Sequence, residues 1–243
     1  MARIILIETS TSLCSVGLAE DGVCTHYKES PQPRSHAAMT APFIKDVLDE
    51  AGLKVKDCDA VCVSKGPGSY TGLRVGSSTA KGLCFGAGIP LIALGTLDIL
   101  AAQATAVLSG SERASSTVRY IVPMIDARRM EVYCAVFSPD GQQLTPTVSQ
   151  VVTPDSFARE LSEGPVLFVG DGAAKCRAVL SSPNAVFPEE VCRPNPFAGC
   201  PRASAMAPLA ENAFREGRFE DTAYFEPFYL KDFIATTPKN RLF

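Results

Sequence analysis

RIILIETSTSLCSVGLAEDGV, residues 3–23, is the stretch that decides the fold. An apolar run ends at the acidic Glu8, small hydroxyl residues follow, and a second apolar run leads to Asp21 and Gly22. The Asp-Gly pair is typical of tight hairpin turns. The stretch therefore predicts two strands that flank a short polar turn, with a hairpin turn after the second strand.

A second stretch repeats this order later in the chain. Residues 119–142 read RYIVPMIDARRMEVYCAVFSPDGQ, again with one acidic residue between two apolar runs and an Asp-Gly pair at the end. Glu8 precedes Gly22 by 14 positions, and Asp126 precedes Gly141 by 15. Each half also has a strand that ends in glycines, AVCVSKGPG and PVLFVGDGAA. The repetition predicts a duplicated α/β unit, with two unrelated hairpins as the alternative.

The composition is that of an ordinary globular protein. The 243 residues are 46% hydrophobic and 20% charged, and the net charge of −3 argues against a broad nucleic-acid-binding surface. No apolar run reaches the roughly 18 residues of a membrane span, and the short N-terminal apolar run meets Glu8 too early for a secretory signal. We therefore expect a cytoplasmic protein with no membrane segment.

Helical periodicity and end signals predict three helices. The first begins after Ser35 and stops at Gly52, and the second runs from about residue 71 to 85. A Ser-rich, charged segment, residues 106–119, reads as a linker between the two halves. The expected division is a first subdomain over 1–107 that is rejoined by a helix at about 203–217, a second subdomain over 108–202, and a C-terminal tail over 218–243.

Residues 63–88, VSKGPGSYTGLRVGSSTAKGLCFGAG, run from a strand through a glycine turn into a helix, an order that suits phosphate binding. The known phosphate-loop patterns do not match. A Walker A loop needs Lys where Leu73 stands, and the dinucleotide pattern needs Gly where Thr71 stands. We interpret the turn as structural, and it consists of Gly66, Pro67 and Gly68.

Paired hairpins that each begin with an acidic residue are typical of the actin, hexokinase and Hsp70 type of ATPase, in which the hairpin turns hold phosphates. Such turns need glycine so that the nucleotide can approach the backbone. Here Thr9 and Ser10 follow Glu8, and the bulky Arg128 lies in the turn that follows Asp126. The sequence therefore assigns no catalytic residue and no cofactor.

The second predicted helix carries a ridge of small residues. Gly72, Gly76, Ala80 and Cys84 recur every four positions and therefore share one face. Glycine inside a helix costs about 1 kcal/mol relative to alanine, so the two glycines require a reason such as close approach of another element. Two interpretations remain at this point: packing inside the monomer, and a subunit interface.

GPGSYTGLRVGSSTAKGL and GIPLIALGTLDILA, together with ILIETST near the start and EPFYLKD near the end, resemble the TsaB/YeaZ family over essentially the whole chain. The resemblance implies an α/β, actin-like ATPase (ASKHA, RNase H-like) fold of two duplicated subdomains. It also implies a non-catalytic partner of TsaD, the subunit that transfers a threonylcarbamoyl group to the adenosine following the anticodon of tRNA.

The resemblance further implies the partners. The first two long helices would pair with a TsaD-type catalytic subunit, or with a second copy as a homodimer when the chain is alone. A TsaE-type ATPase would join the complex, and tRNA would be contacted indirectly. The residues assigned to the interface are Met39, Phe43, Val47, Gly72, Leu73, Gly76, Ala80 and Cys84.

TsaD-type sequences carry a metal-binding NHxxxH segment that corresponds to LGTLDIL here. Thr96 and Leu100 stand at the two histidine positions and cannot replace imidazole ligands, so we expect no metal. This argues against a metallopeptidase-like glycoprotease homologue, and the altered hairpin turns argue against an actin-like small-molecule kinase. These two enzymes are the alternative functions.

Overall fold

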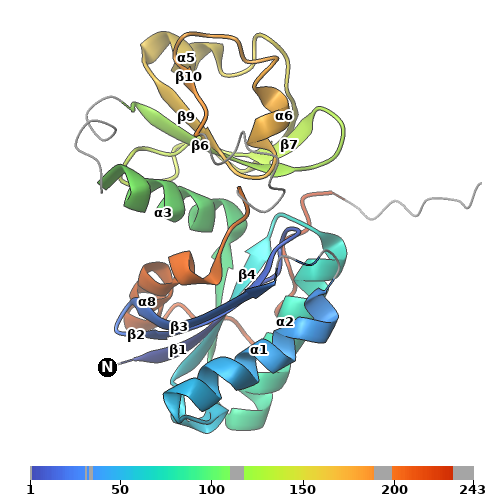
Figure 1. The fold of residues 1–243 in the computed structure, drawn as a ribbon, viewed down its shortest axis with the longest axis vertical. Helices are drawn as coiled ribbons and strands as arrows, with labels where there is room; N and C mark the ends of the chain where they lie inside the picture. Colours follow the sequence, from blue (N-terminus) through green and yellow to red (C-terminus); the bar gives the residue numbers. More distant parts are fainter. Residues whose placement is uncertain (1, 31, 33–34, 110–117, 189–198, 232–243) are drawn as a thin grey trace, which may run out of the picture.

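The computed structural model describes residues 2–30, 32, 35–109, 118–188 and 199–231. These residues form two α/β lobes, which lie one above the other in Figure 1. Each lobe is built on one five-stranded sheet.

The sheet of the first lobe has the strand order β3-β2-β1-β4-β5. Its strands are β1 (Arg3–Glu8), β2 (Cys14–Glu20), β3 (Val23–Ser30), β4 (Ala60–Gly66) and β5 (Leu91–Gly95). β1 pairs antiparallel with β2 and parallel with β4. Asp21 and Gly22 join β2 to β3 with φ angles of 50° and 78°, as the Asp-Gly pattern predicts for a tight hairpin.

The sheet of the second lobe repeats this topology, with the order β10-β9-β6-β7-β8. Its strands are β6 (Tyr120–Asp126), β7 (Glu131–Cys134), β8 (Val148–Val151), β9 (Val166–Val169) and β10 (Ala185–Val186). β6 pairs antiparallel with β7 and parallel with β9, just as β1 pairs with β2 and β4. The predicted duplication is thereby confirmed, and the two hairpins are not unrelated.

Helices cover both faces of the first sheet. The helices that the structure describes in the two lobes together are α1 (His36–Ala51), α2 (Tyr70–Ala87), α3 (Thr96–Ser109), α5 (Ala158–Glu163), α6 (Ala173–Cys176) and α8 (Ala207–Arg215), with short 3-10 turns η1 (Val55–Asp57) and η2 (Ala203–Met206). α1 and α2 pack on one face, and η2 with α8 packs on the other. α1 ends at Gly52, whose φ of 67° forms a left-handed cap. Among the described helices, none is both long and apolar enough to cross a membrane.

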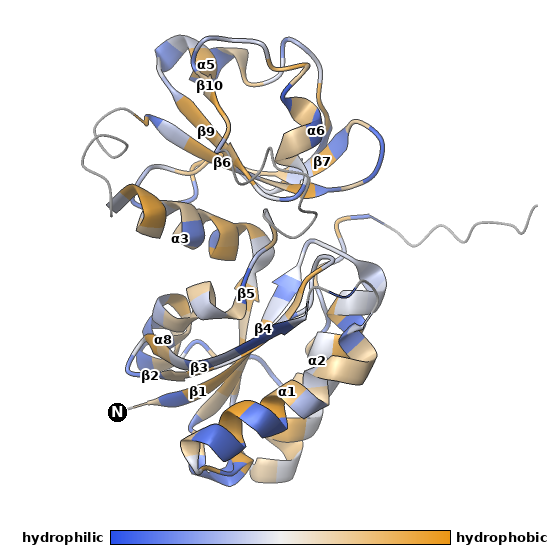
Figure 2. Ribbon diagram, viewed as in Figure 1, coloured by the Kyte–Doolittle hydropathy of each residue, from blue (hydrophilic) through white to orange (hydrophobic). Residues whose placement is uncertain are grey.

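α3 packs on both lobes, so the expected boundary at residue 107 stays a prediction. Ile99 is buried in the core of the first lobe, whereas Leu97, Leu100 and Leu108 pack against Ile121 and Phe137 of the second lobe. Much of α3 is coloured as apolar in Figure 2. The segment read as a linker therefore begins inside a helix. The physical reason is that the apolar side chains of this helix are stable only when they are buried, here by packing against a sheet.

The chain returns to the first lobe after the second sheet is complete. Met206 of η2 and Ala210 of α8 are buried in the first lobe's core. Residues 218–231, which we call the strap, then run along this lobe, and Phe225 of the strap is buried in it. The strap is thus an ordered part of the segment expected to be a tail, and residues 232–243 lie outside the described residues.

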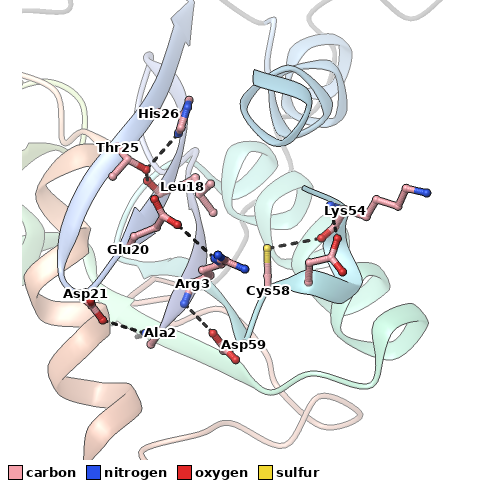
Figure 3. A network of polar contacts seen from close by, with 11 residues as sticks. Ala2, Arg3, Leu18, Glu20, Asp21, Thr25, His26, Lys54, Cys58 and Asp59 are labelled. Atoms are coloured by element: carbon pink, nitrogen blue, oxygen red, sulfur yellow. Dashed lines mark hydrogen bonds and ion pairs between the residues drawn. The ribbon is translucent and has the colours of Figure 1, made fainter. Parts of the chain in front are cut away.

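Polar contacts fasten the amino-terminal end of β1 (Figure 3). The Ala2 N–H donates to Asp21 Oδ1 at 3.1 Å, the Arg3 N–H donates to Asp59 Oδ2 at 2.7 Å, and Arg3 Nε pairs with Glu20 at 3.2 Å. The carboxyl ends of the parallel strands β1, β4 and β5 lie at the opposite edge of the sheet. In open α/β sheets that edge is where ligands bind, so it is the first place to look for a site.

Candidate functional site

The carboxyl edge of the first sheet is filled by its own glycine turn. The Ser69 N–H donates to the Ser10 carbonyl at 2.6 Å, and Thr9 Oγ1 donates to the Gly72 carbonyl at 2.8 Å. A Cβ on Gly68 would lie 2.2 Å from the Ser10 carbonyl oxygen. The small residues of this turn are therefore needed for close packing on the residues that follow β1.

The second lobe repeats this packing at β6. Gly170 has a φ of 105°, and a Cβ there would lie 2.1 Å from the Met124 carbonyl oxygen. A Cβ on Gly172 would lie 3.0 Å from the Asp126 nitrogen. Each glycine turn thus packs against the end of the first strand in its own lobe, which gives the repeated glycines a structural reason in both halves.

The hairpin turn of the second lobe is occupied by its own polar groups. Asp126 Oδ1 accepts from Lys175 Nζ and from the Arg128 N–H, and the Asp126 N–H donates to Asp171 Oδ1 at 2.9 Å. Arg128 and Arg129 adopt positive φ angles of 74° and 51°. A phosphate would have to displace these contacts, so the turn is unsuited to hold one.

Glu8 is the most perturbed acidic group at the carboxyl edge of the first sheet. Its side chain is fully buried, Oε1 accepts from the Ser10 N–H at 2.6 Å, and Oε2 has no partner among the described residues. Burial raises the pKa of Glu8 to about 7, against hydrogen bonds from Ser10 and Ser64 that lower it, and the charge of Asp171 adds to the rise. Glu8 therefore holds a proton well above the usual range of a carboxyl group.

The positions that correspond to metal ligands hold a threonine and a leucine. Thr96 begins α3 and Leu100 lies one turn further on, and both are buried. Over the described ranges, no group of three His, Cys, Asp or Glu side chains is placed to hold a metal ion. Side chains of this kind have no imidazole or carboxylate with which to bind a cation there.

The ridge of small residues on α2 faces into the monomer, which is the first of its two interpretations, so the assignment of these four residues to a subunit interface is wrong. A Cβ on Gly72 would lie 2.0 Å from the Thr9 carbonyl oxygen, and one on Gly76 would lie 2.3 Å from Thr9 Oγ1. Ala80 and Cys84 are buried in the first lobe's core. The ridge allows α2 to approach the first sheet and its hairpin turn closely.

The larger residues assigned to the interface are also part of this core. Phe43, Val47 and Leu73 are buried, and Met39 is partly buried against the same cluster. The apolar periodicity of α1 therefore marks the face that packs on the sheet. A subunit contact made by these helices has to use their other faces.

The outer faces of α1 and α2 lie side by side on the first lobe (Figure 1). Phe85 is 88% exposed, and it lies between Gly82 and Gly86, around which no atom lies within 4 Å of a Cβ position. Besides charged and other polar residues, these helices expose small and apolar ones. We give the name helical face to seven of them, which are Ala37, Ala38, Ala41, Ser78, Gly82, Phe85 and Gly86.

The sequence interpretation missed this face because it followed only the first pair of helical glycines. Gly82 lies six positions after Gly76, which places it about 240° further around the helix. Ser78, Gly82 and Gly86 form a second ridge with the same spacing of four residues. Plotting all four glycines of α2 around the helix axis would have separated an inner pair from an outer pair.

Comparison with known proteins decides the family. A family profile described as "TsaD: tRNA N6-adenosine threonylcarbamoyltransferase" matches residues 30–239. The protein named tRNA threonylcarbamoyladenosine biosynthesis protein TsaB from Escherichia coli (strain K12) is 31% identical over 96% of this chain and 96% of its own. The chain belongs to the TsaB/YeaZ family. The TsaB of Haemophilus influenzae is 32% identical over 96% of this chain and 94% of its own.

Solved structures agree with this membership in the TsaB/YeaZ family. YeaZ from Pseudomonas aeruginosa is 27% identical, with a TM-score of 0.75 over 95% of this chain and 100% of that one. A protein described as uncharacterized, with similarity to peptidase YEAZ from Pseudomonas aeruginosa, is 25% identical, with a TM-score of 0.77 and the same coverage. The family resemblance and the two-lobed, actin-like α/β fold are both confirmed.

Proposed function

We propose that this chain is the non-catalytic partner subunit of a complex that transfers a threonylcarbamoyl group to the adenosine following the anticodon of tRNA. In this role it pairs with a TsaD-type catalytic subunit and activates it. The names of the TsaB relatives support the pathway. The filled hairpin turns, together with the threonine and leucine at the metal-ligand positions, support a role without chemistry of its own.

The observation that carries the pairing is the helical face. Gly82 and Gly86 each lower the stability of the helix by about 1 kcal/mol relative to alanine. Neither glycine is required by packing inside the monomer, because a Cβ at either position would meet no atom within 4 Å. They allow a partner helix to approach the backbone of α2 closely, and Phe85 supplies an exposed apolar side chain beside them. The same face serves a homodimer when the chain is alone.

The remaining parts of the proposal follow from this pairing. A TsaE-type ATPase joins the pair, and the net charge of −3 leaves contact with tRNA to the other subunits. The complex works in the cytoplasm. A metallopeptidase-like or kinase-like activity is not favoured by any feature of the described residues.

Gly82→Leu is expected to weaken pairing with a TsaD-type subunit by about 5- to 150-fold, because it places a side chain where two backbones approach. The monomer should melt no earlier than the wild type, since a Cβ at Gly82 meets no atom within 4 Å. Sedimentation with the TsaD-type subunit measures the pairing, and a tRNA modification assay measures its consequence.

The matched control is Ala158→Leu, which adds the same side chain to the exposed start of α5 in the other lobe. It should leave pairing and tRNA modification unchanged. Wild-type affinity of Gly82→Leu for the TsaD-type subunit would refute the helical face as the contact. Loss of modification with pairing intact would separate activation from association.

The chain alone is expected to hydrolyse ATP with magnesium no faster than buffer does. Lys175 and the Arg128 N–H already donate hydrogen bonds to the carboxylate of Asp126. Glu8 is buried and retains its proton near neutral pH. Phosphate release over several hours checks this expectation. Turnover that requires magnesium and disappears in Glu8→Gln would favour the kinase-like alternative instead.

A further inference from the structure

The strap borders a second distinctive surface, on the first lobe at the end of β4. Here the chain borders an open, shallow hollow of about 580 Å³. Its lining includes the carboxylates of Glu220, Asp221 and Glu226, the ring of Tyr224 and the ammonium group of Lys65. We call this surface the strap hollow.

Aromatic side chains around the strap hollow are unusually exposed. Tyr224 is 84% exposed and Phe228 is 43% exposed, and both line the hollow. Large exposed rings of this kind are typical of interaction sites. Neighbouring Phe225 is buried, so the strap buries one ring and leaves these two exposed.

The carboxylates of the strap hollow are largely uncompensated. Glu220 and Glu226 make no side-chain hydrogen bond or ion pair with any residue that the structure describes. Asp221 Oδ1 accepts from the Ala223 N–H at 2.8 Å, which neutralises none of its charge. These three carboxylates outnumber the ammonium groups of Lys65, which lines the hollow, and of Lys81, which binds the strap's carbonyl groups, so the hollow is net negative.

The backbone around the hollow is held in place before anything binds. The Glu220 N–H donates to the Leu91 carbonyl at 2.8 Å, and the Phe228 N–H donates to the Lys65 carbonyl at 2.7 Å. Between them, Lys81 Nζ donates to the carbonyl of the strap's Phe225 at 3.1 Å. A ligand would therefore meet an ordered surface, and the strap would lose little conformational entropy on binding.

We infer that the strap hollow binds a basic segment of a protein partner. An Arg or Lys side chain of that segment stacks on the ring of Tyr224 and pairs with Glu220 and Glu226, which matches both the aromatic and the acidic character of the hollow. RNA is disfavoured because its phosphates would be repelled by the same carboxylates. The assignment does not depend on pairing through the helical face.

Titration of the isolated full-length chain with a capped oligo-arginine peptide tests this inference. The double variant Glu220→Gln/Glu226→Gln should bind the peptide about ten-fold more weakly, since two exposed ion pairs are lost and the aromatic surface remains. Tyr224→Ala should weaken binding by about two- to five-fold through loss of the cation–π contact. Thermal melting should be unchanged in both.

The matched control removes two carboxylates elsewhere. In the other lobe, Asp155 precedes α5 and Glu160 lies in its first turn, and Asp155→Asn/Glu160→Gln changes the net charge equally. Wild-type binding by this control supports the strap hollow. An equal loss in control and test variants, or no loss in the test variants, would show that oligo-arginine follows overall charge and would overturn the inference.

The chain's own basic residues near its end are the competing occupant. Lys239→Gln/Arg241→Gln in the full chain removes these charges without shortening it. Unchanged peptide affinity supports an external partner. Affinity raised about ten-fold would show that residues 232–243 cover the hollow, and the partner assignment would then be wrong.

Discussion

Gly72→Ala is expected to lower the free energy of unfolding by about 3 kcal/mol, although alanine is the better helix former. The new Cβ would lie 2.0 Å from the Thr9 carbonyl oxygen. That oxygen belongs to a buried backbone that cannot rotate away, unlike Thr9 Oγ1, which lies nearest to a Cβ on Gly76. Urea denaturation measures the loss.

Gly82→Ala provides the matched control, because it makes the same chemical change ten positions later in the same helix. No atom lies within 4 Å of its Cβ position, so the substitution should raise the free energy of unfolding by about 0.5–1 kcal/mol. The two variants should therefore move in opposite directions. Equal effects of both substitutions would contradict the inner and outer assignment of the α2 faces.

The second large effect is a fall in stability between about pH 4.5 and pH 7 caused by Glu8. Burial raises the pKa of Glu8 from 4.5 in the unfolded chain to about 7 in the folded one. Within this window the unfolded chain releases the proton and the folded chain retains it, so rising pH favours unfolding. The loss is complete above pH 7 and amounts to about 3 kcal/mol.

Glu8→Gln removes this pH dependence while keeping an oxygen that can accept from the Ser10 N–H. The variant should be more stable than the wild type at pH 8, by up to about 3 kcal/mol, and nearly equal to it at pH 4.5. Asp171 contributes with the same sign, because burial raises its pKa to about 6. Asp171→Asn measures that share separately. Equal pH profiles of wild type and Glu8→Gln would disprove the protonated state of Glu8.

The duplicated fold was predictable because the chain repeats a local pattern that strands and turns obey directly. An apolar run, an acidic residue and an Asp-Gly pair specify a hairpin in each half, and the two sheets repeat their strand order accordingly. The family motifs also span the chain, so the comparison with known proteins agrees with the resemblance.

The orientation of helices was less predictable, because it depends on contacts between residues far apart in the sequence. A glycine ridge signals close approach, but its spacing is the same whether it faces a sheet or another protein. Gly72 is explained only by Thr9, which lies 63 positions earlier. Likewise, the apolar residues of α3 show that it is buried, and only the fold shows that it packs on both lobes.

The path of the chain has a consequence for its synthesis on the ribosome. The second sheet is complete once residue 186 has emerged, whereas the first sheet waits for η2 and α8 to cover one of its faces. Until then Ile4 and Leu6 lack the cover that Met206 and Ala210 provide. The N-terminal half is therefore translated first but finished last, and a nascent chain of this protein exposes aggregation-prone strands for most of its translation.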